Sequence, residues 1–330
     1  MLGPGRRGLA FVALLLFGVA PAVVAQSASE TQGGLQFILP IGARTLGMGQ
    51  AATAVAVGSD ALWWNPALIA RGPREAALQL TQSLATQSGA DMGLAFIYAV
   101  PKVGAVGLSL RYLNEGESAS TDTSGIQTGT FYAQDLILAA TFAAPFGDRL
   151  ALGLTTKVLR IGFPCTGSCF TSATASTPAQ TGAIDLGAQY FATRDSLLAF
   201  GVALRNLGFK LQLNDTPQAD ALPSRLAVGV AISPKLAQLP PDVRLHAAAD
   251  LVWQLSAASA PGVNLGAELS FKDRYELRGG YVVNGPTGSG MTFGAGVSTG
   301  RLHIDLARML NDVSQQSGVT PTYIAMRYLY

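Results

Sequence analysis

The fold is decided by the stretch Asp91-Met92-Gly93-Leu94-Ala95-Phe96-Ile97-Tyr98-Ala99-Val100. Its even positions are large and apolar, whereas most of its odd positions are small or polar. A period of two is typical of a β-strand with two unlike faces. The alternation recurs at 106–112 and 198–205. We therefore expect a sheet of repeated amphipathic strands.

Counting such runs along the chain predicts fourteen strands, an even number as bacterial outer-membrane barrels have. The predicted strands are 74–84, 91–100, 103–113, 129–143, 149–161, 181–192, 197–207, 224–232, 242–254, 263–272, 275–283, 290–299, 301–308 and 321–330.

The connections between these strands sort by length, as the short periplasmic turns and longer outer loops of such barrels do. The expected periplasmic turns are 101–102, 146–148, 193–195, 272–274 and 299–300. The expected outer loops include 114–128, 162–180, 209–223 and 309–320. Only the periplasmic link 233–241 is longer than this pattern predicts. A soluble β-sandwich gives no reason for such sorting.

Composition and the first residues agree with an exported barrel. Arg6 and Arg7, the apolar run 9–20 and the small residues 23–25 predict a cleavable signal peptide over residues 1–25. The run falls short of the ~20 residues of a membrane-spanning helix. Cleavage leaves equal numbers of acidic and basic residues, which argues against a nucleic-acid partner. The chain is 49% apolar and only 13% charged, and no later apolar stretch is long enough for a membrane helix.

A sheet can cross lipid only if it closes, because every backbone group there needs a partner. We therefore predict an all-β fold, a transmembrane antiparallel β-barrel of about 14 strands over residues 74–330. Residues 26–73 are expected to form an N-terminal plug or hatch that contains a short helix. The expected location is the outer membrane of a Gram-negative-type bacterium, with outer-membrane lipid as a partner.

Ionisable residues within the predicted strands fall on the face without the large apolar side chains, so we expect them to line the lumen. On the lipid face, an Arg or Lys near the midplane costs about 2–4 kcal/mol. The predicted lumen residues are Asp91, Arg111, Asp135, Lys157, Asp185, Arg205, Arg244, His246, Asp250, Glu268, Glu276, Arg278, His303 and Asp305. Both signs occur in similar number, which favours a paired network over a strongly ion-selective pore.

The last predicted strand ends on aromatic Tyr330 and carries Thr322, Ile324, Met326 and Tyr328 on one face. This pattern resembles the C-terminal signal that the barrel-assembly machinery of outer membranes recognises. The resemblance implies that this machinery is a partner of the chain.

Before the first strand, residues 42–69 do not alternate. The small-residue run 51–57 predicts a short helix, and Trp63-Trp64-Asn65-Pro66 predicts a turn, since the residue before proline avoids the helical region. The stretch Gly42 to Gly49 and the block Asp60-Ala61-Leu62-Trp63-Trp64-Asn65-Pro66-Ala67 resemble the PorV/PorQ family, which is related in architecture to FadL-type (OmpP1/FadL) channels.

The resemblance implies a plug or gate at Asp60, Trp63, Trp64, Asn65 and Pro66, and it implies one of two functions. A PorV/PorQ-type barrel supports protein export or surface delivery in a type IX secretion-like system, with cargo proteins or secretion components as partners. The alternative is a FadL-like channel that takes up long-chain fatty acids or other hydrophobic small molecules. Modest outer loops and balanced lumen charge favour export, although the plug block is common to both functions.

The sequence does not suggest an enzyme or a cofactor. Its two histidines are His246 and His303, both near the periplasmic ends of strands, and no catalytic constellation is recognisable around them. Cys165 and Cys169 lie in a predicted outer loop. In an exported chain they are expected to form a disulfide that staples the loop, whereas a metal site would need further ligands.

Overall fold

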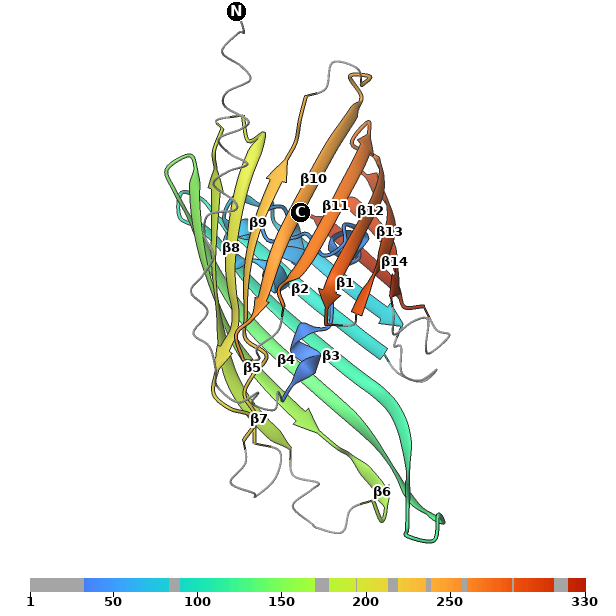
Figure 1. Cartoon of the computed structure of the whole chain (residues 1–330). Helices are drawn as coiled ribbons and strands as arrows, with labels where there is room; N and C mark the ends of the chain where they lie inside the picture. The colour runs from blue at the N-terminus through green and yellow to red at the C-terminus, as the bar shows by residue number, and fades with distance from the viewer. Residues whose placement is uncertain are drawn as a thin grey trace, which may run out of the picture.

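The protein is described from a computed structural model that covers residues 33–330 except 83–89, 170–177, 194, 213–218, 236–238, 257–259, 287 and 312–319. The predicted signal peptide lies outside these residues. Within them, fourteen strands form a closed antiparallel barrel (Figure 1), in which consecutive strands pair and the first strand pairs with the last. No helix of the described part is long and apolar enough to cross a membrane.

The barrel strands confirm the predicted census, and most ends agree within a few residues. They are β1 Glu75–Gln82, β2 Ala90–Val100, β3 Gly104–Thr121, β4 Gln127–Phe146, β5 Leu150–Gly162, β7 Ala179–Phe191, β8 Leu198–Gly208, β9 Arg225–Ile232, β10 Val243–Gln254, β11 Gly262–Phe271, β12 Tyr275–Gly285, β13 Gly288–Thr299, β14 Leu302–Asn311 and β15 Thr322–Leu329.

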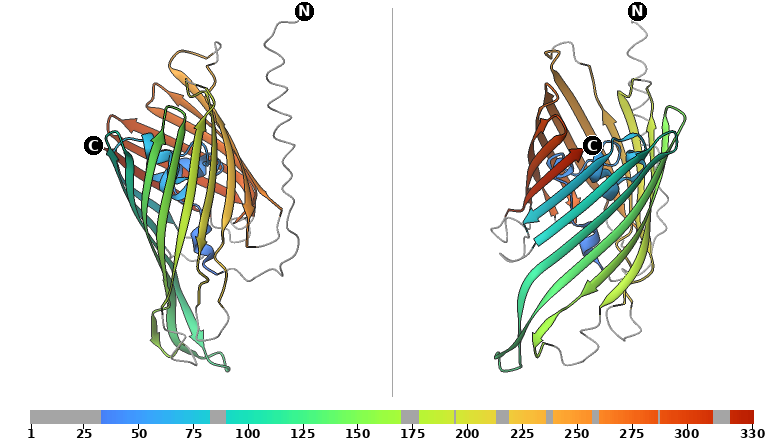
Figure 2. Two further views of the ribbon diagram at one scale, coloured as in Figure 1. Left: turned by 90° about the vertical axis from the view of Figure 1, so that its left-hand side faces the viewer. Right: turned by 180° about the vertical axis from the view of Figure 1, so that it is seen from behind.

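The predicted outer loop 114–128 is wrong, because most of it is strand. β3 and β4 continue as a hairpin that projects beyond the rest of the barrel (Figure 2), and only 122–126 form the turn. The short strand β6, Cys165–Gly167, pairs with the outer end of β4. A disulfide joins Cys165 to Cys169 at this point. The hairpin was missed because its two faces are both polar, so it lacks the alternation that identifies a membrane strand.

The outer surface of the barrel is apolar, as the alternation predicts. On β3, Leu108 is 60% exposed whereas the next residue, Ser109, is 6% exposed. Exposed aromatic side chains gather at the strand ends that join the tight turns, where a barrel meets one membrane interface. They are Tyr98, Phe146, Tyr190, Phe271, Tyr275, Tyr328 and Tyr330. This belt identifies the barrel as a membrane-spanning one of the outer-membrane type.

The N-terminal segment lies inside the barrel and consists of single helical turns. They are η1 Leu35–Ile38, α2 Ala43–Gly47, η2 Gly58–Asp60, α3 Ala61–Trp64 and η3 Pro66–Arg71. The segment is the blue chain within the ring of strands in Figure 2. The expected plug with a short helix is therefore present.

The helix predicted at 51–57 is wrong, because this run forms turns. A residue of the wall and a later residue of the plug supply hydrogen-bond partners in place of those that a helix would have within itself. The Asp250 carboxylate accepts from the amides of Ala52 and Thr53, at 2.8 and 2.9 Å. The Thr53 carbonyl accepts from the Asn65 side chain. Asp250 is 198 positions from Ala52 and Asn65 is 12 positions from Thr53, so the run 51–57 does not itself reveal these partners.

The exposure of Leu108 predicts an assembly defect in Leu108→Arg, since a charge would face lipid at a cost of about 2–4 kcal/mol near the midplane. The measurement is the electrophoretic shift between unheated and boiled outer-membrane extracts. Val103→Arg is the matched control, because Val103 is 52% exposed in the turn between β2 and β3. Normal assembly of both variants would contradict the assigned lipid face.

Candidate functional site

The plug fits tightly against the wall because the wall carries glycine on its inner face. A Cβ atom at Gly153 would overlap the backbone of Pro66 and Ala67, and one at Gly187 would overlap the Asn65 side chain. Further glycines that face the plug are Gly107, Gly201, Gly229, Gly266, Gly280 and Gly294. These eight of the 38 glycines are thus explained by the close approach of the plug to the wall.

Asn65 links two parts of the plug to β7. Its Nδ2 donates to the carbonyls of Thr53, at 2.6 Å, and Ala188, at 3.1 Å. Its Oδ1 accepts from the Ala67 amide at 3.1 Å, which caps η3. The side chain is fully buried, so each group left unpaired by its removal would cost about 1–3 kcal/mol. The chain is extended at Asn65, as expected before proline.

Trp63 and Trp64 belong to α3 rather than to the predicted turn, which is confined to Asn65. The Trp64 indole donates to the Ile41 carbonyl at 3.0 Å. The Arg205 guanidinium lies 5.0 Å from the centre of the Trp64 ring and donates to the Trp63 carbonyl at 3.3 Å. The cation thus covers one side of α3 by a cation–π contact and a hydrogen bond.

Asp60 and Glu75 join the plug to β1. The Asp60 carboxylate accepts from the amide and hydroxyl of Thr45, at 3.1 and 2.7 Å, and from Gln79 Nε2 at 2.7 Å. Glu75 accepts from the Ser59 amide at 2.7 Å. Burial raises the pKa of the Asp60 carboxyl above its ordinary value, although the hydrogen bonds from Thr45 lower it. These buried hydrogen bonds hold the plug against β1.

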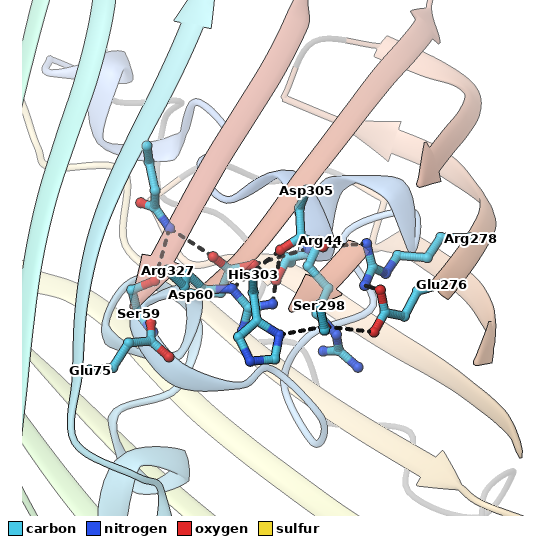
Figure 3. Close-up of polar contacts among 12 residues, drawn as sticks. Arg44, Ser59, Asp60, Glu75, Glu276, Arg278, Ser298, His303, Asp305 and Arg327 are labelled. Carbon is cyan, nitrogen blue, oxygen red and sulfur yellow. Dashed lines mark hydrogen bonds and ion pairs between the residues drawn. The ribbon is translucent and has the colours of Figure 1, made fainter. Parts of the chain in front are cut away.

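A chain of alternating charges runs from the plug to the last strand (Figure 3). Arg44 of α2 makes two hydrogen bonds of 2.9 Å with Glu268 of β11. Arg278 of β12 contacts Glu268 at 2.5 Å and Asp305 at 2.6 Å. Arg327 of β15 contacts Asp305 at 2.8 Å. Each acid has two arginine partners, as buried charges require.

The structure places most of the predicted lumen residues in the interior of the barrel. Asp91, Arg111, Asp135, Lys157, Asp185, Asp250, Glu268, Arg278 and Asp305 are all buried inside. Asp91 pairs with Arg111, and Lys157 lies 2.5 Å from Asp185. Arg205, Glu276, His246 and His303 are partly buried.

Arg244 is the exception among the predicted lumen residues. Its side chain is 64% exposed and pairs with Asp273 at 2.9 Å. Arg244 is the second residue of β10 and therefore lies at the rim of the barrel. A residue at the rim is exposed to solvent even when its side chain is on the inner face of the strand.

Four charged residues of the interior were missed by the sequence analysis. They are Arg44, Glu75, Arg225 and Arg327. The alternation that identified the other residues also puts Arg327 on the inner face of the last strand. Glu75 and Arg225 begin strands, where the period is hardest to read, and Arg44 lies in the plug, where no period applies.

Ser298, His303 and Glu276 come together at the inner face without forming a catalytic triad. Ser298 Oγ lies 2.6 Å from His303 Nδ1 and donates to Glu276 at 3.2 Å. In a triad the carboxylate orients the far side of the imidazole, whereas here it contacts the serine. The arrangement therefore does not activate the serine as a nucleophile.

A cavity lies on the side of the plug nearer the outer loops. Phe37, Trp63 and Trp64 line it from the plug, and Arg205 and Arg225 line it from the wall. Its volume of about 40 Å³ is enough for a few water molecules and far below the 300–1,000 Å³ typical of small-molecule sites. This cavity therefore has no room for a small-molecule ligand in the arrangement that the structure describes.

The close packing at Gly153 predicts that Gly153→Val displaces η3 and opens the lumen, since overpacking of this kind costs about 1–3 kcal/mol. Ion conductance of the purified protein in planar bilayers should rise. Gly279→Val is the control, because a Cβ at Gly279 meets no atom within 4 Å. Unchanged conductance in a folded Gly153→Val barrel would contradict the plug assignment.

Solved structures similar to this barrel include two toluene transporters and a FadL homologue. The toluene transporter TodX of Pseudomonas putida is 14% identical with a TM-score of 0.57, and 92% of this chain covers 98% of that one. The toluene transporter TbuX of Ralstonia pickettii is 15% identical with a TM-score of 0.57, at 88% and 98% coverage. A FadL homologue of Pseudomonas aeruginosa is 12% identical with a TM-score of 0.52, at 91% and 99% coverage.

The sequence matches no protein-family model and no curated protein. The structural likeness supports the relation to FadL-type barrels, whereas the resemblance to PorV/PorQ finds no support in these comparisons. The chain therefore shares its overall barrel fold with these solved structures.

Proposed function

We propose that the protein is a non-enzymatic outer-membrane channel for the uptake of hydrophobic small molecules. This is the alternative of the two functions drawn from the sequence. Neighbours described as toluene transporters and as a FadL homologue support it. No comparison supports protein export of the PorV/PorQ type.

The observation that carries the proposal is the position of the plug's aromatic residues. The cavity lies between the plug and the outer loops, and its apolar lining includes Phe37, Trp63 and Trp64 of the plug. A hydrophobic molecule that enters from outside would thus meet the plug first. The cavity is too small to hold such a molecule, so uptake requires a second arrangement in which the plug has shifted, and ligand binding favours that arrangement.

Asn65 and Pro66 are the residues best placed to couple this shift to the wall. They follow directly on Trp63 and Trp64, and they contact β7 at Gly187 and Ala188. Movement of Trp63 and Trp64 would therefore change the contacts that Asn65 and Pro66, at the junction of α3 and η3, make with β7. We assign the gate to this junction.

The test is uptake of radiolabelled toluene by cells that lack their own hydrocarbon channels. Expression of the barrel should raise the rate of uptake. Asn65→Ala combined with Pro66→Ala should change that rate, because it removes the amide contacts and the restriction on the preceding residue. Asp148→Ala is the control, since Asp148 is exposed in the turn between β4 and β5.

An unchanged rate of toluene uptake on expression of the folded wild-type barrel would overturn the proposal for this compound class. Loss of surface proteins from a deletion strain, with hydrophobic uptake intact, would favour export. Equal uptake by the double variant and the wild type would remove Asn65 and Pro66 from the gate while leaving the channel.

A further inference from the structure

Three basic side chains surround a hollow at the end of the barrel that carries the tight turns. Arg71 ends η3 of the plug, Arg74 directly precedes β1, and Lys102 lies in the turn between β2 and β3. The hollow has a volume of about 350 Å³, and its apolar lining includes Val103 and Pro145. None of the described residues that line it is acidic. Three like charges thus come together from three segments of the chain.

The charges of this hollow are oriented but not neutralised. Within the described part of the chain, no ion pair joins any of the three cations to a carboxylate. Arg71 Nη2 donates to the carbonyls of Gly147 and Leu150, at 2.8 and 3.0 Å. Arg74 Nη2 donates to the Tyr98 hydroxyl at 3.2 Å. These bonds use one nitrogen of each guanidinium, which has further N–H donors to offer a ligand.

The hollow adjoins the aromatic belt that marks one membrane interface. The Arg74 guanidinium lies 4.2 Å from the centre of the Tyr98 ring, and Tyr98 is 39% exposed on the lipid side. The strand faces next to the hollow are apolar, with Phe96 of β2 45% exposed and Val106 of β3 40% exposed. Cations therefore lie at the depth of the lipid head groups, beside a surface that acyl chains can cover.

We propose that Arg71, Arg74 and Lys102 bind the phosphate head group of an anionic phospholipid in the membrane leaflet at this end of the barrel. The planar fork of an arginine matches two oxygens of a phosphate, and a lysine adds a point charge. Basic residues at a membrane surface attract anionic lipids. A soluble anion would meet the same charges, but it would leave the apolar faces of β2 and β3 unused.

A head group in the hollow joins the end of the plug to the wall. Arg71 belongs to the plug, Arg74 precedes the first strand, and Lys102 belongs to the first tight turn. One phosphate between them contacts all three segments, so the lipid helps to hold η3 in place. The site does not depend on the proposed uptake function, because it needs only the closed barrel in its membrane.

The test is the binding of phosphatidylglycerol and phosphatidylcholine, with the same acyl chains, to the purified barrel in neutral detergent. Native mass spectrometry counts the bound lipids over a range of lipid concentrations. The test variant combines Arg74→Gln with Lys102→Gln. The matched control combines Lys272→Gln with Arg274→Gln in the turn between β11 and β12, where both cations also lie over aromatic rings but have Asp273 between them.

The wild-type barrel should bind phosphatidylglycerol in preference to phosphatidylcholine. The test variant should bind phosphatidylglycerol about tenfold more weakly, because two cations are gone, and the control should bind it as the wild type does. The electrophoretic shift between unheated and boiled samples checks that each variant is folded. If the test variant does not assemble, Lys102→Gln alone, in an exposed turn, should show a smaller loss of the same kind.

Equal binding of the two lipids by the wild type would overturn the site. An equal loss in the test variant and the control would overturn it too, because the charge of the whole rim, rather than the hollow, would then attract the lipid. Inorganic phosphate is the third probe, and it should not displace bound phosphatidylglycerol. Displacement at equal concentrations would assign the hollow to a soluble anion and overturn the lipid site.

Discussion

Backbone amides at the depth of the lipid hydrocarbon have no water to bond, so each must find its partner within the protein. The pairing of β1 with β15 meets this requirement by removing the last free edge of the sheet. Closure also determines which side chains go where. One face of every strand meets lipid, and the other meets an interior that must itself be filled.

The interior is filled by the chain's own N-terminal segment, and this close packing constrains the residues of both the wall and the plug. The wall gives up side chains, as at Gly153 and Gly187. The plug lacks regular helical hydrogen bonds over 51–57, and side chains of Asp250 on the wall and of Asn65 in the plug itself provide partners there instead. Apolar packing adds to these polar contacts, because Leu62, Trp64 and Ile69 of the plug belong to one buried hydrophobic cluster with residues of the wall. A shift of the plug would therefore have to exchange contacts of both kinds.

The membrane-spanning part could be predicted from the sequence because lipid imposes an unambiguous contrast on alternate residues. Leu108 and Ser109 illustrate that contrast. The β3–β4 hairpin extends beyond the lipid and has no such contrast, so the sequence predicts a loop there. The small residues of 51–57 predict a helix because the run does not reveal its partners Asp250 and Asn65, which lie outside it. Arg225 was missed because it begins β9, where the period of two is hardest to read.

The order in which the chain emerges gives the closing strand a further consequence. The plug comes first, yet Arg44 finds its carboxylate 224 positions later in the sequence. Arg327, which completes the charge chain, lies on the last strand of all. Contacts over such separations form late, because the intervening chain must first be brought together. Arg44 of the plug therefore has no carboxylate partner until β11 has been added to the barrel. The charge chain is complete only when β15 pairs with β1 and closes the barrel.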